Sequence, residues 1–173
     1  SAVLLKNEDG ILPVGAKVQA AIIGDFAFDP RYQGAGSSMV NSTKVDSIKD
    51  MLETSGISVT GIVRGYQRDG KEDEAMKKEA VDLARRSDVV LFFFGLNEKS
   101  ETEGLDRKHL RIPQNQINLI QELAKANANM IGIISAGSVI EMPWHHHFKA
   151  LLHTALMGQA GAGAVLDILS GKV

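Results

Sequence analysis

The apolar run DVVLFFF, residues Asp88–Phe94, decides the fold class of this chain. A nearly continuous apolar run of this length is typical of a strand that is covered on both faces of a sheet. Amphipathic helices are predicted on either side of it, over Asp73–Arg86 and Gln114–Ala126. A buried strand between two such helices favours parallel pairing with right-handed crossovers.

The same alternation of strand and helix continues along most of the chain. Helical spacing predicts further helices over Thr43–Ser55 and Ala160–Leu169, the first with Thr43 and Asp46 as a capping box and Gly56 as its stop. The prediction is an α/β fold, an open and mostly parallel sheet with helices on both faces, as in a flavodoxin-like three-layer sandwich. The other apolar segments that predict strands are Ala20–Gly24, Ile57–Val63, Asn129–Ser135 and Ala150–Ala155.

Length and composition limit the class of protein. The 173 residues suit one domain; we expect residues 1–16 to form a lead-in arm and residues 17–173 to form the sandwich. The absence of cysteine excludes disulfides, thiolate metal sites and a cysteine nucleophile. A net charge of −2 argues against nucleic acid as a partner, and no apolar run approaches the ~20 residues of a membrane helix. The compartment stays open, with a weak leaning towards the cytoplasm because no leader and no cysteine are present.

Two connections are much longer than the roughly 2–6 residues that are usual in such folds. They run over Asp25–Ser42 and Gly95–Pro113, and both leave the carboxyl end of a predicted strand. In a sheet of order 2-1-3-4-5, the strands that precede them flank the switch point where open α/β sheets bind ligands. The two loops are therefore expected to meet there and to hold the functional site.

The second of these loops is rich in carboxylates. Crowded carboxyl groups raise one another's pKa, and a carboxyl that stays protonated can act as a general acid. The positive charges of Arg107 and Lys108 would lower the pKa of the carboxyl groups, so the direction of any shift stays open. The alternative, a solvated polar loop whose charges neutralise one another, also stays open. The carboxylates are Glu98, Glu101, Glu103 and Asp106.

The segment Glu101-Thr102-Glu103-Gly104-Leu105-Asp106-Arg107 resembles the E-S/T-E-G-x-D-R signature of glycoside hydrolase family 3. In particular, it is similar to the second, α/β-sandwich domain of the β-glucosidase branch. Agreement elsewhere extends over nearly the whole chain and makes the resemblance specific. The matching segments are Ser1–Glu8, Leu12-Pro13, Asp29–Ser38, Ala136–Ser138, Glu141–Trp144 and Gly158-Gln159.

The resemblance implies a retaining β-glycosidase whose active site is shared by two domains. The nucleophilic aspartate would belong to a preceding (β/α)₈ barrel, and the sandwich would supply the general acid/base to a β-linked oligosaccharide or an aryl or alkyl β-glycoside. Matching the signature assigns that role to Glu103, with Glu101 as the second choice. No cofactor or metal is implied. Because this chain contains no barrel, we expect it to fold but not to hydrolyse glycosides on its own.

The resemblance also implies a set of residues around the sugar. Arg31 and Gln33 would contact the leaving-group side of the substrate. Asp106 and Arg107 are further candidates for substrate binding, although an ion pair between them that orients the loop is the favoured role.

Other readings stay open beside this one. The Gly34–Ser38 turn could cradle a phosphate with its backbone amides, which would make the chain a nucleotide- or phosphate-binding module. A non-catalytic carbohydrate-binding module is a third hypothesis.

The histidines at His145–His147 and His153 suggest a metal site, but the side chains of consecutive histidines diverge, so we expect no metal. Trp144 is expected to be a packing residue rather than a platform for a sugar.

Overall fold

The computed structural model describes residues 1–173, which form one six-stranded sheet. The strands are β1 (Val3–Asn7), β2 (Ala20–Ile23), β3 (Val59–Val63), β4 (Val89–Gly95), β5 (Met130–Ser135) and β6 (Ala150–His153). Their order across the sheet is β1-β6-β5-β4-β2-β3. All neighbours from β6 to β3 run parallel, whereas β1 pairs with β6 in the antiparallel sense.

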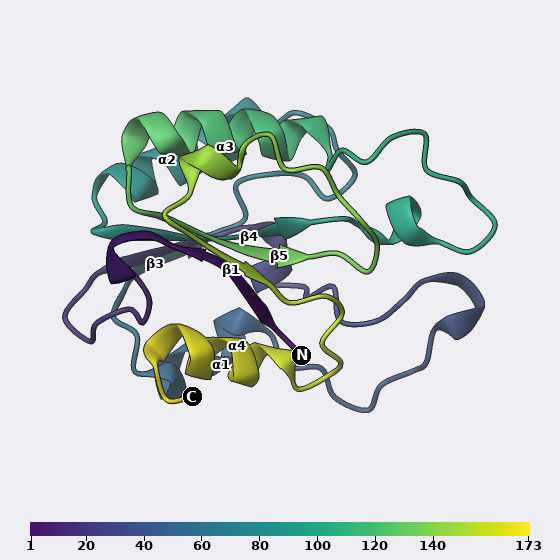
Figure 1. The fold of residues 1–173 in the computed structure, drawn as a ribbon, viewed down its shortest axis with the longest axis horizontal. Coiled ribbons are helices and arrows are strands. Elements are labelled where there is room, and N and C mark those ends of the chain that lie inside the picture. The colour runs from purple at the N-terminus through teal and green to yellow at the C-terminus, as the bar shows by residue number, and fades with distance from the viewer.

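Four helices cover the sheet in two layers (Figure 1). The layer above it in Figure 1 holds α2 (Glu74–Arg85) and α3 (Gln114–Ala126). The layer below it holds α1 (Ile48–Ser55) and α4 (Gly161–Ser170). The three-layer α/β sandwich and the 2-1-3-4-5 order of its parallel strands are therefore confirmed, because β3-β2-β4-β5-β6 is that order.

Residues 1–16, the segment expected to form a lead-in arm, contribute to the sheet and to its core. Val3–Asn7 extend the sheet as β1, a strand that the sequence prediction missed. Leu12 and Val14 are buried in the core on the side of α1 and α4. Residues 1–16 therefore pack directly against the sheet and its core.

The central strand β4 supplies apolar side chains to both layers, as its sequence predicts. Phe92 and Phe94 belong to the core beneath α2 and α3, and Phe93 belongs to the core above α1 and α4. This alternation is the two-residue period of a strand. Phe94 also stacks on Phe148, with 5.6 Å between the ring centroids, which joins β4 to the segment before β6.

Helix α1 begins later than predicted, and with a different cap. Its N-cap is Ser47, whose hydroxyl accepts a hydrogen bond from the backbone N–H of Asp50 at 3.1 Å. The capping box expected at Thr43 and Asp46 does not form, because the chain there is still irregular. The predicted stop is confirmed: Gly56 follows the helix with φ of 80°, a left-handed conformation that suits glycine.

None of the helices is both long enough and apolar enough to span a membrane.

Candidate functional site

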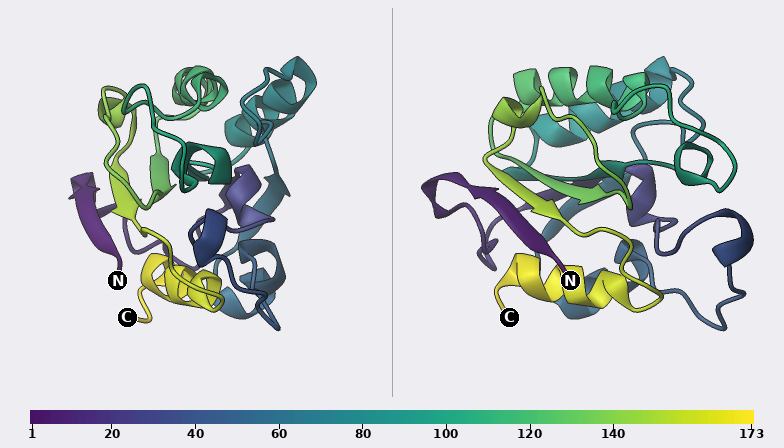
Figure 2. Two further views of the ribbon diagram at one scale, coloured as in Figure 1. Left: turned by 90° about the vertical axis from the view of Figure 1, so that its right-hand side faces the viewer. Right: turned by 45° about the vertical axis from the view of Figure 1, so that its right-hand side comes forward.

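Three loops gather at the carboxyl end of the parallel strands, on the right-hand side of Figure 1. They follow β2, β4 and β5 and span residues 24–47, 96–113 and 136–149. A parallel β-bridge between Ala35 and Thr102 joins the first two loops. The left panel of Figure 2 faces this end of the molecule and shows the short turns Gly36–Ser38 and Glu98–Glu101 of these two loops. The prediction that the two long loops meet is confirmed.

Glu101 lies inside the junction of the three loops. Its side chain is only 7% exposed, and its Oε2 lies 3.5 Å from Nη2 of Arg31, which comes from the loop after β2. From the loop after β5, the N–H of Gly137 donates to Oε2 at 3.0 Å and the hydroxyl of Ser138 donates to Oε1 at 2.7 Å. One carboxylate therefore ties all three loops together.

Arg31 is buried on the other side of this ion pair. Its side chain is 1% exposed, so Glu101 compensates a guanidinium that has almost no access to water. A contact between Arg31 and the leaving group of a substrate would require the loops that cover the arginine to move, because its side chain is almost completely buried. The structure brings Arg31 and Glu101 together, although 70 residues separate them in the sequence.

Glu103, two residues further on, has the opposite environment. It is exposed at the tip of the loop, and both the hydroxyl and the backbone N–H of Ser37 donate hydrogen bonds to its Oε2. These bonds, first the one from the hydroxyl and then the one from the backbone, hold the pKa of Glu103 below the usual value of a glutamate. The direction of the shift, which the sequence left open, is therefore set by Ser37.

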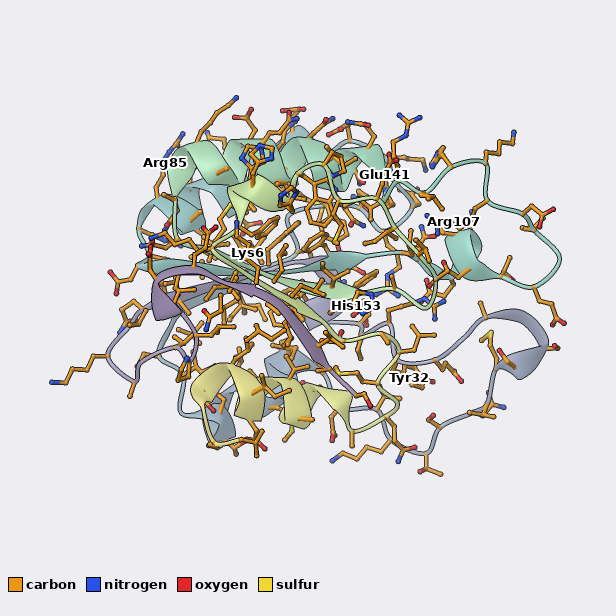
Figure 3. The ribbon with its side chains drawn as sticks, in the orientation of Figure 1. Lys6, Tyr32, Arg85, Arg107, Glu141 and His153 are labelled. Carbon is orange, nitrogen blue, oxygen red and sulfur yellow. The ribbon has the colours of Figure 1, made fainter.

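Asp106 and Arg107 do not form the ion pair expected of them. Nη1 of Arg107 instead donates to the hydroxyl of Ser138 at 3.0 Å and to the carbonyl of Val139 at 2.7 Å. Neighbouring side chains in a non-helical segment diverge, so a distant partner on another loop is easier to reach. In Figure 3, Arg107 lies at this end of the molecule, opposite Arg85 on α2.

The loop after β2 closes on itself and on Glu103. The side chain of Gln33 donates to the carbonyl of Val40 at 3.1 Å and accepts from its N–H at 3.0 Å. The amide of Ser37, which a phosphate would need, is already bound to the carboxylate of Glu103. This contact disfavours the phosphate-binding hypothesis, because an anionic side chain already occupies part of the turn.

A surface hollow of about 400 Å³ lies beside the loop that carries Glu101. Charged side chains, namely Arg31, Glu101, Asp106 and Arg107, form part of its wall together with the apolar Leu105. The side chain of Leu105 is exposed to solvent at this hollow. The hollow therefore combines charged groups with an apolar edge.

Sequence reasoning missed the carboxylate that anchors the base of these loops. Asp25 lies two residues after the end of β2 and is buried, and it forms ion pairs with Arg64 and Arg68. Arg68 also pairs with Glu98 at 3.0 Å, which fastens the turn that leads to Glu101. The available signal was position, since an aspartate at the carboxyl end of a central strand lies at the edge where the loops converge.

The aromatic and histidine candidates play no part in this site. Trp144 is 3% exposed and packs edge-on against Phe94 at 5.0 Å, which confirms it as a packing residue. His145 and His146 place their Nδ1 atoms 2.9 Å from backbone carbonyls of the preceding turn. Nowhere in residues 1–173 do three or more histidine or carboxylate side chains gather in a way that could hold a metal ion.

Comparison of the sequence with known proteins identifies the family of this chain. The model of the Glycosyl hydrolase family 3 C-terminal domain matches residues 2–173. The chain is 42% identical over 184 residues to an exo-alpha-(1->6)-L-arabinopyranosidase of Bifidobacterium breve, a match that covers 100% of this chain and 24% of that protein. It is 41% identical over 177 residues to thermostable beta-glucosidase B of Acetivibrio thermocellus, covering 100% of this chain and 23% of that protein.

Solved structures agree with the sequence matches. The crystal structure of the GH3 beta-glucosidase of Bifidobacterium adolescentis superposes with a TM-score of 0.94 at 44% identity, over 99% of this chain and 25% of that chain. The chain thus spans about a quarter of the length of the relatives that it matches.

Proposed function

Because this chain belongs to glycosyl hydrolase family 3, as the C-terminal domain of β-glucosidase-like glycosidases, we propose that it supplies the general acid/base of a retaining β-glycosidase. We assign that role to Glu103. The nucleophilic aspartate is proposed to come from a (β/α)₈ barrel in the same parent protein. The substrates would be terminal β-linked glycosides, whether oligosaccharides or aryl and alkyl glycosides.

The observation that carries the assignment is the contrast between the two glutamates of the signature. Glu101 is engaged by Arg31 and by the loop after β5, whereas Glu103 is exposed and its carboxylate hydrogen-bonds only to Ser37. A general acid/base must reach a substrate that binds outside this domain. Only Glu103 is free to do so without breaking a buried ion pair.

Two proton transfers would be assigned to Glu103 in this scheme. In the first step the protonated carboxyl donates its proton to the glycosidic oxygen while the barrel aspartate attacks the anomeric carbon, so the leaving group departs as an alcohol. In the second step the carboxylate takes a proton from water, whose oxygen displaces the aspartate and releases the sugar. The two carboxyl groups of such sites lie roughly 5–5.5 Å apart.

The two domains would have opposite effects on the pKa of Glu103. Ser37 favours the carboxylate, which is the form that the second step needs. A second carboxylate nearby opposes ionisation and raises the pKa, which is what the first step needs. The barrel aspartate would therefore make Glu103 an acid when the two domains come together.

The identity of the sugar is a separate question. The two relatives named above carry different activities, yet they are 42% and 41% identical to this chain. This near equality supports the view that the choice of sugar is made mainly in the barrel.

The assignment is tested by Glu103→Gln and Glu101→Gln in the full-length protein that contains this chain. Glu103→Gln should lower turnover of glycosides with poor leaving groups by about 10²–10⁴-fold, because general acid/base catalysis contributes that much. Glycosides whose leaving group needs no proton should still react in the first step. Azide, a nucleophile that needs no base, should then restore turnover and yield a glycosyl azide.

Glu101→Gln serves as the matched control, since it changes the same group two residues away. It should reduce the amount of folded enzyme without making turnover depend on azide. Azide-dependent turnover in Glu101→Gln, or full activity in Glu103→Gln, would contradict the assignment. Sugar binding without turnover in the unaltered protein would favour the non-catalytic carbohydrate-binding module instead.

A further inference from the structure

The loop after β2 is built to lie against Glu103. The β-bridge between Ala35 and Thr102 sets the two loops in register. Gly36 has φ of 81°, and a Cβ at this position would lie 2.9 Å from the Cβ of Glu103. A residue with a side chain is therefore both strained and crowded at position 36, and glycine allows the backbone of the turn to approach the glutamate.

This approach places two donors of Ser37 on one oxygen of Glu103. The backbone N–H lies 3.2 Å from Oε2, and the Ser37 hydroxyl donates to the same atom. No group of the protein donates to Oε1. The two oxygens of the carboxyl group are thus unequal: one is anchored and the other is free.

No charged side chain competes with Ser37 for this carboxylate. Glu103 forms no ion pair with any residue of either loop, and Arg107 of its own loop is occupied by Ser138 and Val139. The neighbouring hydroxyl of Ser38 donates elsewhere, to the carbonyl of Ala35 at 3.3 Å.

We propose, on the basis of the function assigned to Glu103 above, that Ser37 is the positioning residue of the acid/base: it anchors Oε2 and leaves Oε1 as the oxygen that exchanges the proton. Hydrogen bonds to a carboxylate stabilise its charged form, so Ser37 also sets the proton affinity of Glu103. Ser37 does not touch the reacting atoms and acts only through the glutamate.

The test measures the titration of Glu103 in this chain by NMR of glutamate labelled at the carboxyl carbon, with Glu103→Gln identifying its resonance. Ser37→Ala should move the midpoint upward, because the hydroxyl that stabilises the carboxylate is lost. Ser37→Thr keeps a hydroxyl and should retain the original midpoint, and Ser38→Ala is the matched control that should leave it unchanged. An unchanged midpoint in Ser37→Ala, or an equal shift in Ser38→Ala, would overturn the inference.

A second readout uses the full-length enzyme. The basic limb of its kcat/KM profile reports the ionisation of the general acid, so Ser37→Ala should move that limb to higher pH while Ser38→Ala leaves it in place. A limb that does not move would count against Ser37. The NMR titration is independent of activity, so it can succeed or fail separately from the assignment of Glu103 as acid/base, which the azide experiment tests.

Discussion

Replacing Glu101 by glutamine should destabilise the domain far more than the same change at Glu103. The side chains of Glu101 and Arg31 are 7% and 1% exposed, so the variant leaves a buried guanidinium without a counter-charge. Breaking a buried pair from one side costs about 3–5 kcal/mol of unfolding free energy. We expect the lower end, about 3 kcal/mol, because the amide oxygen of glutamine can still accept a hydrogen bond from Ser138 or Gly137.

This loss is large enough to measure by ordinary unfolding experiments. For a domain of this length it corresponds to a fall of roughly 6–12 °C in Tm. Trp144, the single tryptophan, is buried in the core and should report unfolding in urea through its fluorescence. Glu103→Gln is the control; since Glu103 is exposed and its side chain hydrogen-bonds only to Ser37, it should lose much less stability in urea than Glu101→Gln.

A double variant separates the buried charge from other effects. Arg31→Met combined with Glu101→Leu removes both charges and should recover part of the stability that Glu101→Gln loses, because no uncompensated ion remains. If Glu101→Gln unfolds together with Glu103→Gln, the ion pair does not stabilise the loops and the reasoning is refuted. If the double variant is no more stable than Glu101→Gln, the buried charge is not the source of the loss.

Three further predictions follow from the chain itself. The purified chain should not release p-nitrophenol from p-nitrophenyl β-D-glucoside; turnover that disappears in Glu103→Gln would disprove this. Ser47→Ala should lower the unfolding free energy by about 1 kcal/mol through loss of the cap of α1, whereas Thr43→Ala should not, as urea titrations can show. Burial raises the pKa of Tyr66, so the Tyr66 phenol should ionise only when the protein unfolds in alkali, as absorbance near 295 nm would reveal. The sign follows from that shift: the unfolded chain ionises Tyr66 near its usual pKa of about 10, so stability is full below that pH and falls above it.

The elements that the sequence predicts well are those whose signal is local. The apolar run at Asp88–Phe94 contains most of β4, and Gln114–Ala126 is the observed extent of α3. Both depend on a periodicity within one segment. The order of the parallel strands follows from the alternation of strands and helices, because right-handed crossovers leave few arrangements. The edge strand β1 escaped prediction because its side chains are mostly exposed, unlike those of the central strands.

The site was predictable only in part, because its contacts join distant segments. The loops and Glu103 could be named from their place after strands and from the signature. The partners could not: Ser37 lies 66 residues before Glu103, and Ser138 lies 37 residues after Glu101. The expected ion pair between Asp106 and Arg107 was wrong because the side chains of consecutive residues point in different directions. Burial, which separates Glu101 from Glu103, is a property of the folded chain.

The junction around Glu101 has a consequence for protein engineering. A chimaera that imports only residues 96–113 from a distant relative would bring in a glutamate or its replacement without the matching arginine and serine. Because the arginine and serine come from the loops after β2 and β5, such a graft risks an orphaned charge in the interior. Grafts should succeed more often when the loops after β2, β4 and β5 are exchanged together, because their residues at this junction depend on one another.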